Sequence, residues 1–223
     1  MESIKNNTPL NIMVFGAAGG IGRHCVEIAL AKGHLVTAVL RTPSKLALTH
    51  PNLQLVKGDV TNPASFKDHL EGKDAVISTI GVNGGFGKDK PTTLYSLGAQ
   101  NILASMEHTG ANRAFFISAS ALEVSPVVPF FVRLLIKYVV QKLLKHMYED
   151  LRRMETIIKQ SAINWTIMRP PQLTDQPLTE NYRVAINEYL KNGLKISRAD
   201  LAHFIITSID EPVTFKAIVE TAY

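Results

Sequence analysis

A glycine-rich segment constrains the fold of this chain more than any other feature of the sequence. Gly16, Gly19 and Gly22 have the spacing G-x-x-G-x-x-G, directly after the apolar run 10–15. The first glycine allows a tight turn, the second lets backbone approach a phosphate, and the third lets a following helix pack closely on the strand. Free N–H groups at the start of that helix attract anions. The segment therefore predicts a dinucleotide-binding loop. Its predicted cofactor-binding residues are Gly16, Ala18, Gly19, Gly20, Ile21 and Gly22.

Short apolar runs alternate with longer amphipathic segments along most of the chain. The runs are rich in Val, Ile and Phe and apolar throughout, which is typical of strands buried on both faces of a parallel sheet. The predicted strands are residues 10–15, 35–40, 53–57, 75–79, 114–117 and 165–168. The predicted helices are residues 20–32, 63–70, 92–109 and 132–161. This alternation predicts an α/β fold with a Rossmann-like doubly wound parallel sheet flanked by helices.

The pattern changes in the last part of the chain. A polar stretch that begins with two adjacent prolines covers 170–181, and Ser197 then opens a last helix, with Asp200 three residues on as an approximate capping box. A final strand is predicted near 216–220. This tail is too small for a separate domain, so we expect one NAD(P)-binding domain over 1–223, with the tail as a small substrate-side segment.

The residues after the second predicted strand indicate which dinucleotide binds. NAD-binding domains usually place an acid there to hold the ribose hydroxyls. This chain instead has Arg41 and Lys45 and no acid between them. Arg41 can hold a 2′-phosphate through paired charge-assisted hydrogen bonds, and Lys45 can add a charge. We therefore expect NADPH as cofactor, with NADH less favoured; the alternative is that both cations are solvated surface residues.

Composition narrows the class of protein further. The net charge of +5 could indicate nucleic-acid binding, but the basic residues are scattered, so we expect no nucleic-acid partner and a basic pocket for an anionic cofactor. One cysteine, Cys25, excludes an internal disulfide framework and fits a reducing compartment. The histidines lack metal-ligand spacing, and the N-terminus lacks a signal-peptide core. We expect a cytoplasmic protein without a metal.

With these residues placed, the chain resembles atypical short-chain dehydrogenase/reductases of the NAD(P)H-binding, NmrA-like kind. Within that group it is most similar to the biliverdin-IXβ reductase/flavin reductase enzymes, over nearly its whole length. Besides the glycine loop, the resemblance is carried by the sequences GDV, DAVI, SA, PP, DQPLT and DLAHF. They lie at residues 58–60, 74–77, 120–121, 170–171, 175–179 and 200–204.

The resemblance implies where the other cofactor contacts lie. All of them fall at carboxyl ends of predicted strands, where a doubly wound sheet binds its ligand. They are Asp59 and Val60 at the adenine, Thr79, Ile80 and Gly81 along the ribose and pyrophosphate, Ala119 and Ser120 beside the nicotinamide, and Pro170, Pro171, Gln172 and Leu173 over its other side. Asp59 also fits an ordinary turn acid after a strand.

Candidate catalytic residues are few. Tyr138 and Lys142 have the Tyr-x-x-x-Lys spacing of typical short-chain reductases. They precede the stretch that matches the family helix, where Met147 and Leu151 occupy the expected positions, so we interpret the spacing as chance. Ser120 remains as the catalytic candidate, a hydrogen-bond donor near nicotinamide or substrate, although it also fits a serine that caps a strand end.

The resemblance implies an NADPH-dependent reductase that passes hydride to a flavin, quinone or tetrapyrrole-like acceptor, largely by orienting the reactants. The resembling reductases tend to carry histidine at Gln172, and glutamine cannot titrate, which argues against a proton donor there. The alternative is a non-catalytic NAD(P)-binding redox sensor of the NmrA-like type. A sugar-nucleotide epimerase fits less well, because the tail is short for a nucleotide-sugar domain.

The segment 129–145 is longer than in the resembling enzymes. As a helix it carries Arg133, Lys137, Gln141 and Lys145 as a narrow polar stripe, and most of its other residues are apolar. Charges interrupt its apolar runs too often for a transmembrane span. Packing into the domain's own core is the first expectation. A lid over a hydrophobic substrate, a self-association surface and a peripheral membrane helix are the alternatives.

Overall fold

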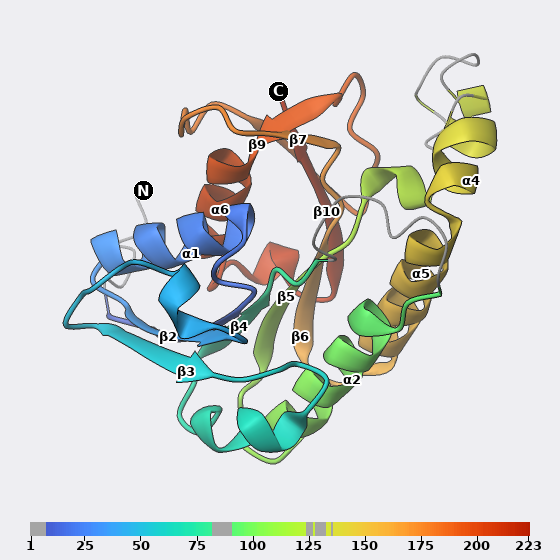
Figure 1. Ribbon diagram of the computed structural model, residues 1–223. Coiled ribbons are helices and arrows are strands. Elements are labelled where there is room, and N and C mark those ends of the chain that lie inside the picture. The colour runs from blue at the N-terminus through green and yellow to red at the C-terminus, as the bar shows by residue number, and fades with distance from the viewer. Residues whose placement is uncertain (1–7, 82–90, 124–126, 128–132, 135) are drawn as a thin grey trace.

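The apolar runs form one mainly parallel sheet at the centre of the molecule (Figure 1). The computed structural model describes residues 8–81, 91–123, 127, 133–134 and 136–223. Each neighbouring pair of strands described in this sheet is parallel, except β10 with β8. In spatial order the strands are β3 (Leu53–Lys57), β2 (Leu35–Leu40), β1 (Asn11–Phe15), β4 (Ala75–Ser78), β5 (Arg113–Ile117), β6 (Asn164–Met168), β10 (Ala217–Ala222) and β8 (Arg183–Ile186).

Helices cover both faces of the sheet (Figure 1). On one face α1 (Gly20–Ala31) packs beside α6 (Arg198–Thr207). On the other face α2 (Leu94–Glu107) packs beside α5 (Lys145–Gln160). The strand order reverses between β1 and β4, as in a doubly wound sheet. The Rossmann-like fold predicted from the sequence is confirmed.

Side chains alternate across the strands and build a core on each face. In β1, Ile12 and Val14 enter the core beneath α1 and α6, whereas Met13 and Phe15 enter the core beneath α2 and α5. All four side chains are buried. Each contributes about 1.5–3 kcal/mol by leaving water. Because both faces of the sheet are buried, the strand sequences are apolar throughout, and apolar and polar residues do not alternate along them.

The tail after β6 folds over the edge where the parallel strands end. It forms a small second sheet of β7 (Gln172–Thr174) with β9 (Lys195–Ser197), which the sequence pattern did not predict. The predicted helix start is confirmed, because Ser197 Oγ accepts a hydrogen bond of 2.9 Å from the Asp200 N–H. The predicted final strand is also present, as β10.

Buried Asp200 ties this tail together. Its carboxylate accepts hydrogen bonds from the N–H groups of Thr179 and Glu180, at 2.9 and 2.8 Å. It also accepts from the hydroxyls of Thr179, Ser197 and Tyr223. Burial opposes ionisation, but these hydrogen bonds outweigh it and lower the pKa of Asp200. One carboxylate therefore joins the polar stretch, the start of α6 and the C-terminal residue.

Two predicted helices differ from the structure. Residues 63–70 form two short 3-10 turns, Pro63–Ser65 and Lys67–His69, instead of one helix. The predicted helix 132–161 is interrupted, and its first residue lies outside the described part. Ile136–Val140 is a π-helical turn, followed by the short α4 (Gln141–Leu143), and the regular helix α5 starts only after Leu144. Leu144 leaves helical geometry, with φ −107° and ψ 23°.

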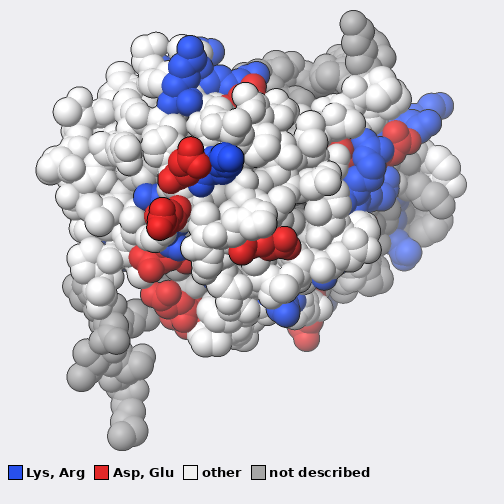
Figure 2. Space-filling view, turned by 90° about the horizontal axis from the view of Figure 1, so that it is seen from below, with Lys and Arg blue, Asp and Glu red and all other residues white. Residues whose placement is uncertain are grey.

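The surface in Figure 2 mixes charges of both signs. On that face Lys and Arg side chains alternate with Asp and Glu, and neither sign forms a continuous field. Within the described ranges, no helix is long and apolar enough to cross a membrane.

Candidate cofactor-binding site

The glycine loop turns sharply from β1 into α1. Gly16 has φ +77°, a conformation that glycine adopts without strain. The N–H of Gly19 donates to the Gly16 carbonyl at 2.8 Å and closes the turn. Ala18, Gly19 and Gly20 are exposed, Ile21 is half-buried, and no side-chain hydrogen bond caps the start of α1. The start of α1 can therefore receive the phosphates of a dinucleotide.

Thr79, directly after β4, lies in close contact with the glycine loop. Its side-chain hydroxyl donates to the Phe15 carbonyl at 2.9 Å, and its N–H donates to the same carbonyl at 3.0 Å. A Cβ at Gly16 would lie 2.7 Å from the Thr79 carbonyl oxygen, and one at Gly22 would collide with the Gly16 carbonyl oxygen. Both glycines are therefore required by the close approach of α1, β1 and the end of β4.

Arg198 lies over the exposed side of the loop. A Cβ at Gly20 would collide with the Arg198 side chain, which places that side chain at the start of α1. The guanidinium of Arg198 donates to the Asp175 carboxylate at 2.6 Å. Arg198 was not among the residues predicted from the sequence, because nothing in the pattern brings the start of α6 to this loop.

Arg41 and Lys45 follow β2 at the same edge of the sheet, and both are exposed. Across from Arg41, Asp59 accepts hydrogen bonds from the N–H and hydroxyl of Thr61, at 2.9 and 2.7 Å. These two hydrogen bonds, with a smaller contribution from Arg41, lower the pKa of Asp59. The Asp59 carboxylate is therefore bonded within its own turn, to Thr61. The exposed Arg41 guanidinium can then bind an anion.

Val60 and Ile80 form an apolar wall beside α2. A Cβ at Gly98 would lie 3.1 Å from a Val60 methyl group and 3.5 Å from Ile80 Cδ1, so both side chains meet this helix at its glycine. Asn101 donates to the Val60 carbonyl at 2.9 Å and holds the turn in place. Gly81, after Ile80, is exposed.

The predicted nicotinamide side is joined by backbone contacts. The N–H of Ser120 donates to the Pro170 carbonyl at 3.0 Å, so the segments after β5 and β6 lie together. Ala119 and Pro171 are half-buried here. Gln172 is exposed at the start of β7, where its N–H donates to the Leu194 carbonyl at 3.2 Å.

The two predicted residues after the prolines have different surroundings: Gln172 is exposed, whereas Leu173 is not. Leu173 pairs with Ile196 and packs against the core beneath α1 and α6, so its side chain belongs mainly to the core. The structure thus brings Ser120 and the prolines together.

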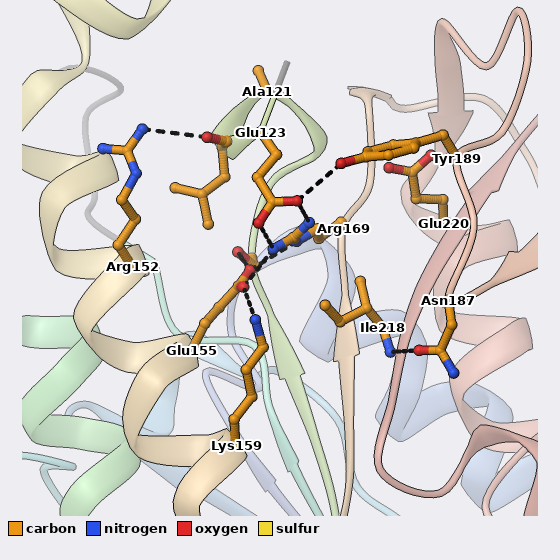
Figure 3. A network of polar contacts seen from close by, with 12 residues as sticks. Ala121, Glu123, Arg152, Glu155, Lys159, Arg169, Asn187, Tyr189, Ile218 and Glu220 are labelled. Carbon is orange, nitrogen blue, oxygen red and sulfur yellow. Dashed lines mark hydrogen bonds and ion pairs between the residues drawn. The ribbon is translucent and has the colours of Figure 1, made fainter. Parts of the chain in front are cut away.

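An ionic network around the buried side chains of Arg169 and Glu155 lies beneath this side and was not predicted (Figure 3). Arg169, at the end of β6, donates to Glu155 of α5 at 2.9 and 2.6 Å. It also donates to Glu123 at 2.8 and 3.0 Å. Ser118 donates to Glu155 at 2.7 Å. Glu155 of α5 therefore joins Ser118, after β5, to the Arg169 guanidinium, at the end of β6.

The charges of this network are mutually stabilised. Hydrogen bonds from Arg169 hold the pKa of Glu123 down at about 2. Burial opposes ionisation of Glu155, but its bonds to Arg169 and Ser118 outweigh it and lower its pKa. Tyr189 extends the network, because its hydroxyl donates to Glu123 at 3.1 Å (Figure 3). Glu123 and Tyr189 thus bring polar groups to the predicted substrate side.

A separate groove of about 770 Å³ lies between the two 3-10 turns and α2. Lys67, Asn101 and His108 are among its lining residues, and it shares none with the predicted cofactor site. In the described part of the chain, no three His, Cys, Asp or Glu side chains are grouped as a metal site would require.

Comparisons with known proteins bear on the fold and the family of this chain. An uncharacterized chloroplastic protein of Arabidopsis thaliana is 28% identical over 219 residues, which cover 93% of this chain and 75% of that protein. A protein of Bacillus subtilis named as an uncharacterized sugar epimerase is 27% identical over 208 residues, covering 92% of this chain and 90% of its own. A short-chain dehydrogenase/reductase of Veillonella parvula, solved in complex with NADP, has a TM-score of 0.76 at 16% identity and covers 97% of this chain and 95% of its own.

The family match covers nearly the whole fold. It begins at the first glycine of the loop, runs over residues 16–212, and is described as NAD(P)H-binding. The matched range includes the loop, Thr79, both segments of the nicotinamide side and the ionic network. The chain belongs to the NAD(P)H-binding family of Rossmann-fold proteins.

Proposed function

We propose that the protein is an NADPH-dependent reductase of the NmrA-like kind, which passes hydride to a flavin, a quinone or a tetrapyrrole-like acceptor. The observation that carries the proposal is the open glycine loop with exposed Arg41 beyond β2, where an NAD-specific domain would have an acid. The geometry favours a dinucleotide that carries an additional phosphate on its adenine ribose.

Different groups in the site bind different parts of the cofactor. The start of α1 and its glycines take the pyrophosphate, and Arg198 lies beside them as a further donor. Arg41 and Lys45 take the 2′-phosphate, through charge-assisted hydrogen bonds worth about 1.5–3 kcal/mol each. In this arrangement Val60 borders the adenine and Ile80 the ribose and pyrophosphate, and both side chains pack against α2.

The chemistry of such a site rests on orientation more than on acid–base catalysis. The bound cofactor supplies the hydride. On α5, Met147 and Leu151 stand where the typical Tyr/Lys pair would be, and both pack against the core. The segment from Pro170 to Gln172 and the segment at Ser120 would hold nicotinamide and acceptor face to face. Ser120 is the proposed hydrogen-bond donor to one of them.

The test follows NADPH absorbance with FMN, FAD, a small quinone and biliverdin, each against a protein-free control. We expect saturable oxidation with one acceptor. Ser120→Ala should lower kcat about tenfold, as the loss of one hydrogen bond in the transition state would. Ser161→Ala is the matched control, because Ser161 lies at the far end of α5 and donates to the Ile158 carbonyl. Equal effects of the two variants would contradict the role of Ser120.

A non-catalytic NAD(P) sensor is the second candidate. The observation that favours it is the replacement of the Tyr/Lys pair by core residues on α5. NADPH binding without oxidation by any acceptor would favour the sensor. Conversion of a nucleotide sugar without net cofactor turnover would favour instead an epimerase, as the Bacillus subtilis relative is named.

A further inference from the structure

Apolar side chains project from the helical turns that precede α5. Leu134, Tyr138, Val139 and Leu143 are exposed to 39%, 62%, 52% and 48%. The expectation that this segment packs entirely into the domain core is therefore wrong for these residues. We call the four side chains the apolar face. Exposed apolar residues gathered along one short segment point to a binding surface.

The opposite side of the same turns is anchored to the body of the protein. Val140 and Leu144 pack against the core beneath α2 and α5. Gln141 donates from its side-chain amide to the carbonyls of Ala121 and Leu122, at 2.9 and 3.3 Å. Because these contacts set the orientation of the turns, the apolar face is held outward.

The charged residues on the segment that carries the apolar face are all positive. Arg133, Lys142 and Lys145 are exposed, and the sequence contains no Asp or Glu between Glu123 and Glu149. Lys145 approaches Glu149 at 3.8 Å, a loose and exposed ion pair. Cations beside exposed apolar side chains are the composition of an interfacial helix on anionic lipid.

We propose that the apolar face and its flanking cations bind an anionic lipid surface. A second copy of the chain is disfavoured, because a two-fold contact would bring the cations of the same segment together, and that segment contributes no acid to neutralise them. The turns that carry the apolar face, including α4, lie next to the start of α5, towards the end of the sheet at which β5 and β6 finish (Figure 1). Docking would therefore bring the substrate side of the protein close to the lipid. The proposal does not depend on the reductase activity.

The test is co-sedimentation of the full chain with vesicles. One set contains phosphatidylcholine alone, and the other phosphatidylcholine mixed equally with phosphatidylglycerol. We expect binding to the anionic vesicles, weakening as salt is added, and little binding to the neutral ones. Arg133→Gln with Lys142→Gln should lower the affinity about thirtyfold, since each cation near an anionic surface contributes a factor of about five.

Apolar variants separate lipid binding from self-association. Val139→Ser with Leu143→Ser should lower vesicle binding at least about tenfold. The matched control is Lys67→Gln with Val213→Ser, because both residues are exposed and belong to other elements. This control should bind as the unaltered protein does. Failure of the folded protein to bind anionic vesicles would overturn the proposal. So would a concentration-dependent dimer that Val139→Ser with Leu143→Ser abolishes.

Discussion

Gly22 is the residue on which the packing of the cofactor loop depends most. A Cβ there would collide with the backbone oxygen of Gly16, which has no free rotation to escape. We expect Gly22→Ala to destabilise the protein by about 1–3 kcal/mol and to weaken NADPH binding. Denaturant unfolding and an NADPH titration measure the two effects.

Gly20→Ala is the matched control for this loop. A Cβ at Gly20 meets only the side chain of Arg198, which can swing away. We expect a loss of stability much smaller than that of Gly22→Ala. Equal destabilisation by the two substitutions would contradict the packing described for the loop.

Glu123 gives the ionic network a defined pH dependence. Its pKa in the folded protein is about 2, below its ordinary value of 4.5, because Arg169 donates hydrogen bonds to it. A depressed carboxyl pKa adds stability above the ordinary pKa, and that stability is lost as pH falls towards the folded pKa. We expect the advantage of the unaltered protein over Glu123→Gln to shrink between about pH 4.5 and about pH 2. Denaturant unfolding at several pH values measures it.

The control for this pH dependence is Glu149→Gln. Glu149 is partly exposed on α5 and pairs loosely with Lys145 and His146. Its removal should leave the acid branch of the stability curve nearly unchanged. If Glu123→Gln loses stability with falling pH as steeply as the unaltered protein, Glu123 does not contribute through Arg169.

At the level of single residues, the sequence predicted the glycine loop but did not predict the ionic network around Arg169. The glycines were predictable because each answers a local geometric need within one strand–turn–helix unit. Arg169, Glu155 and Ser118 come from three elements, so only the tertiary fold brings them together. Two features could have indicated the network. Arg169 ends an apolar strand, and Glu155 lies next to Met154, which is buried on α5.

Among the elements, the strands of the main parallel sheet were the most predictable. Continuous apolar runs bounded by turns leave little ambiguity, and β1 to β6 fall where the sequence indicates. The helix predicted at 63–70 was wrong because Pro63 and the later turns keep the chain in 3-10 geometry. β7, β8 and β9 escaped prediction because they are short, partly exposed and without a continuous apolar pattern.

Asp200 holds the elements of the C-terminal tail in place. Asp200→Asn removes the charge that the N–H groups of Thr179 and Glu180 and the Tyr223 hydroxyl share. We expect a loss of about 2–3 kcal/mol in the free energy of unfolding, as charged hydrogen bonds are replaced by neutral ones. Proteolysis should then become faster between residues 174 and 182.

Asp68→Asn is the control for the tail, because Asp68 is an exposed acid in a 3-10 turn. It should change neither stability nor the rate of proteolysis. An Asp200→Asn protein as stable as this control would show that the tail does not depend on the carboxylate.

In the whole molecule, segments far apart in sequence meet at the edge where the parallel strands end. The glycine loop, the turn after β2 and the segments after β5 and β6 all reach it, and Arg198 arrives from the C-terminal tail. This convergence follows from parallel strand direction, which is why the meeting of these segments at one edge could be predicted. The position of the turns before α5 was not, because their amphipathic pattern fits both burial and an outward face.

The central claim is that Arg41 makes this edge a site for NADPH. The most direct measurement is the Kd of NADPH and of NADH for the unaltered protein, Arg41→Ala and the control Lys32→Ala, which removes an exposed cation at the C-terminal end of α1. The account predicts that Arg41→Ala weakens NADPH binding about tenfold to a hundredfold and leaves NADH binding nearly unchanged, while Lys32→Ala changes neither. An equal loss for both cofactors, or no loss for either, would contradict it.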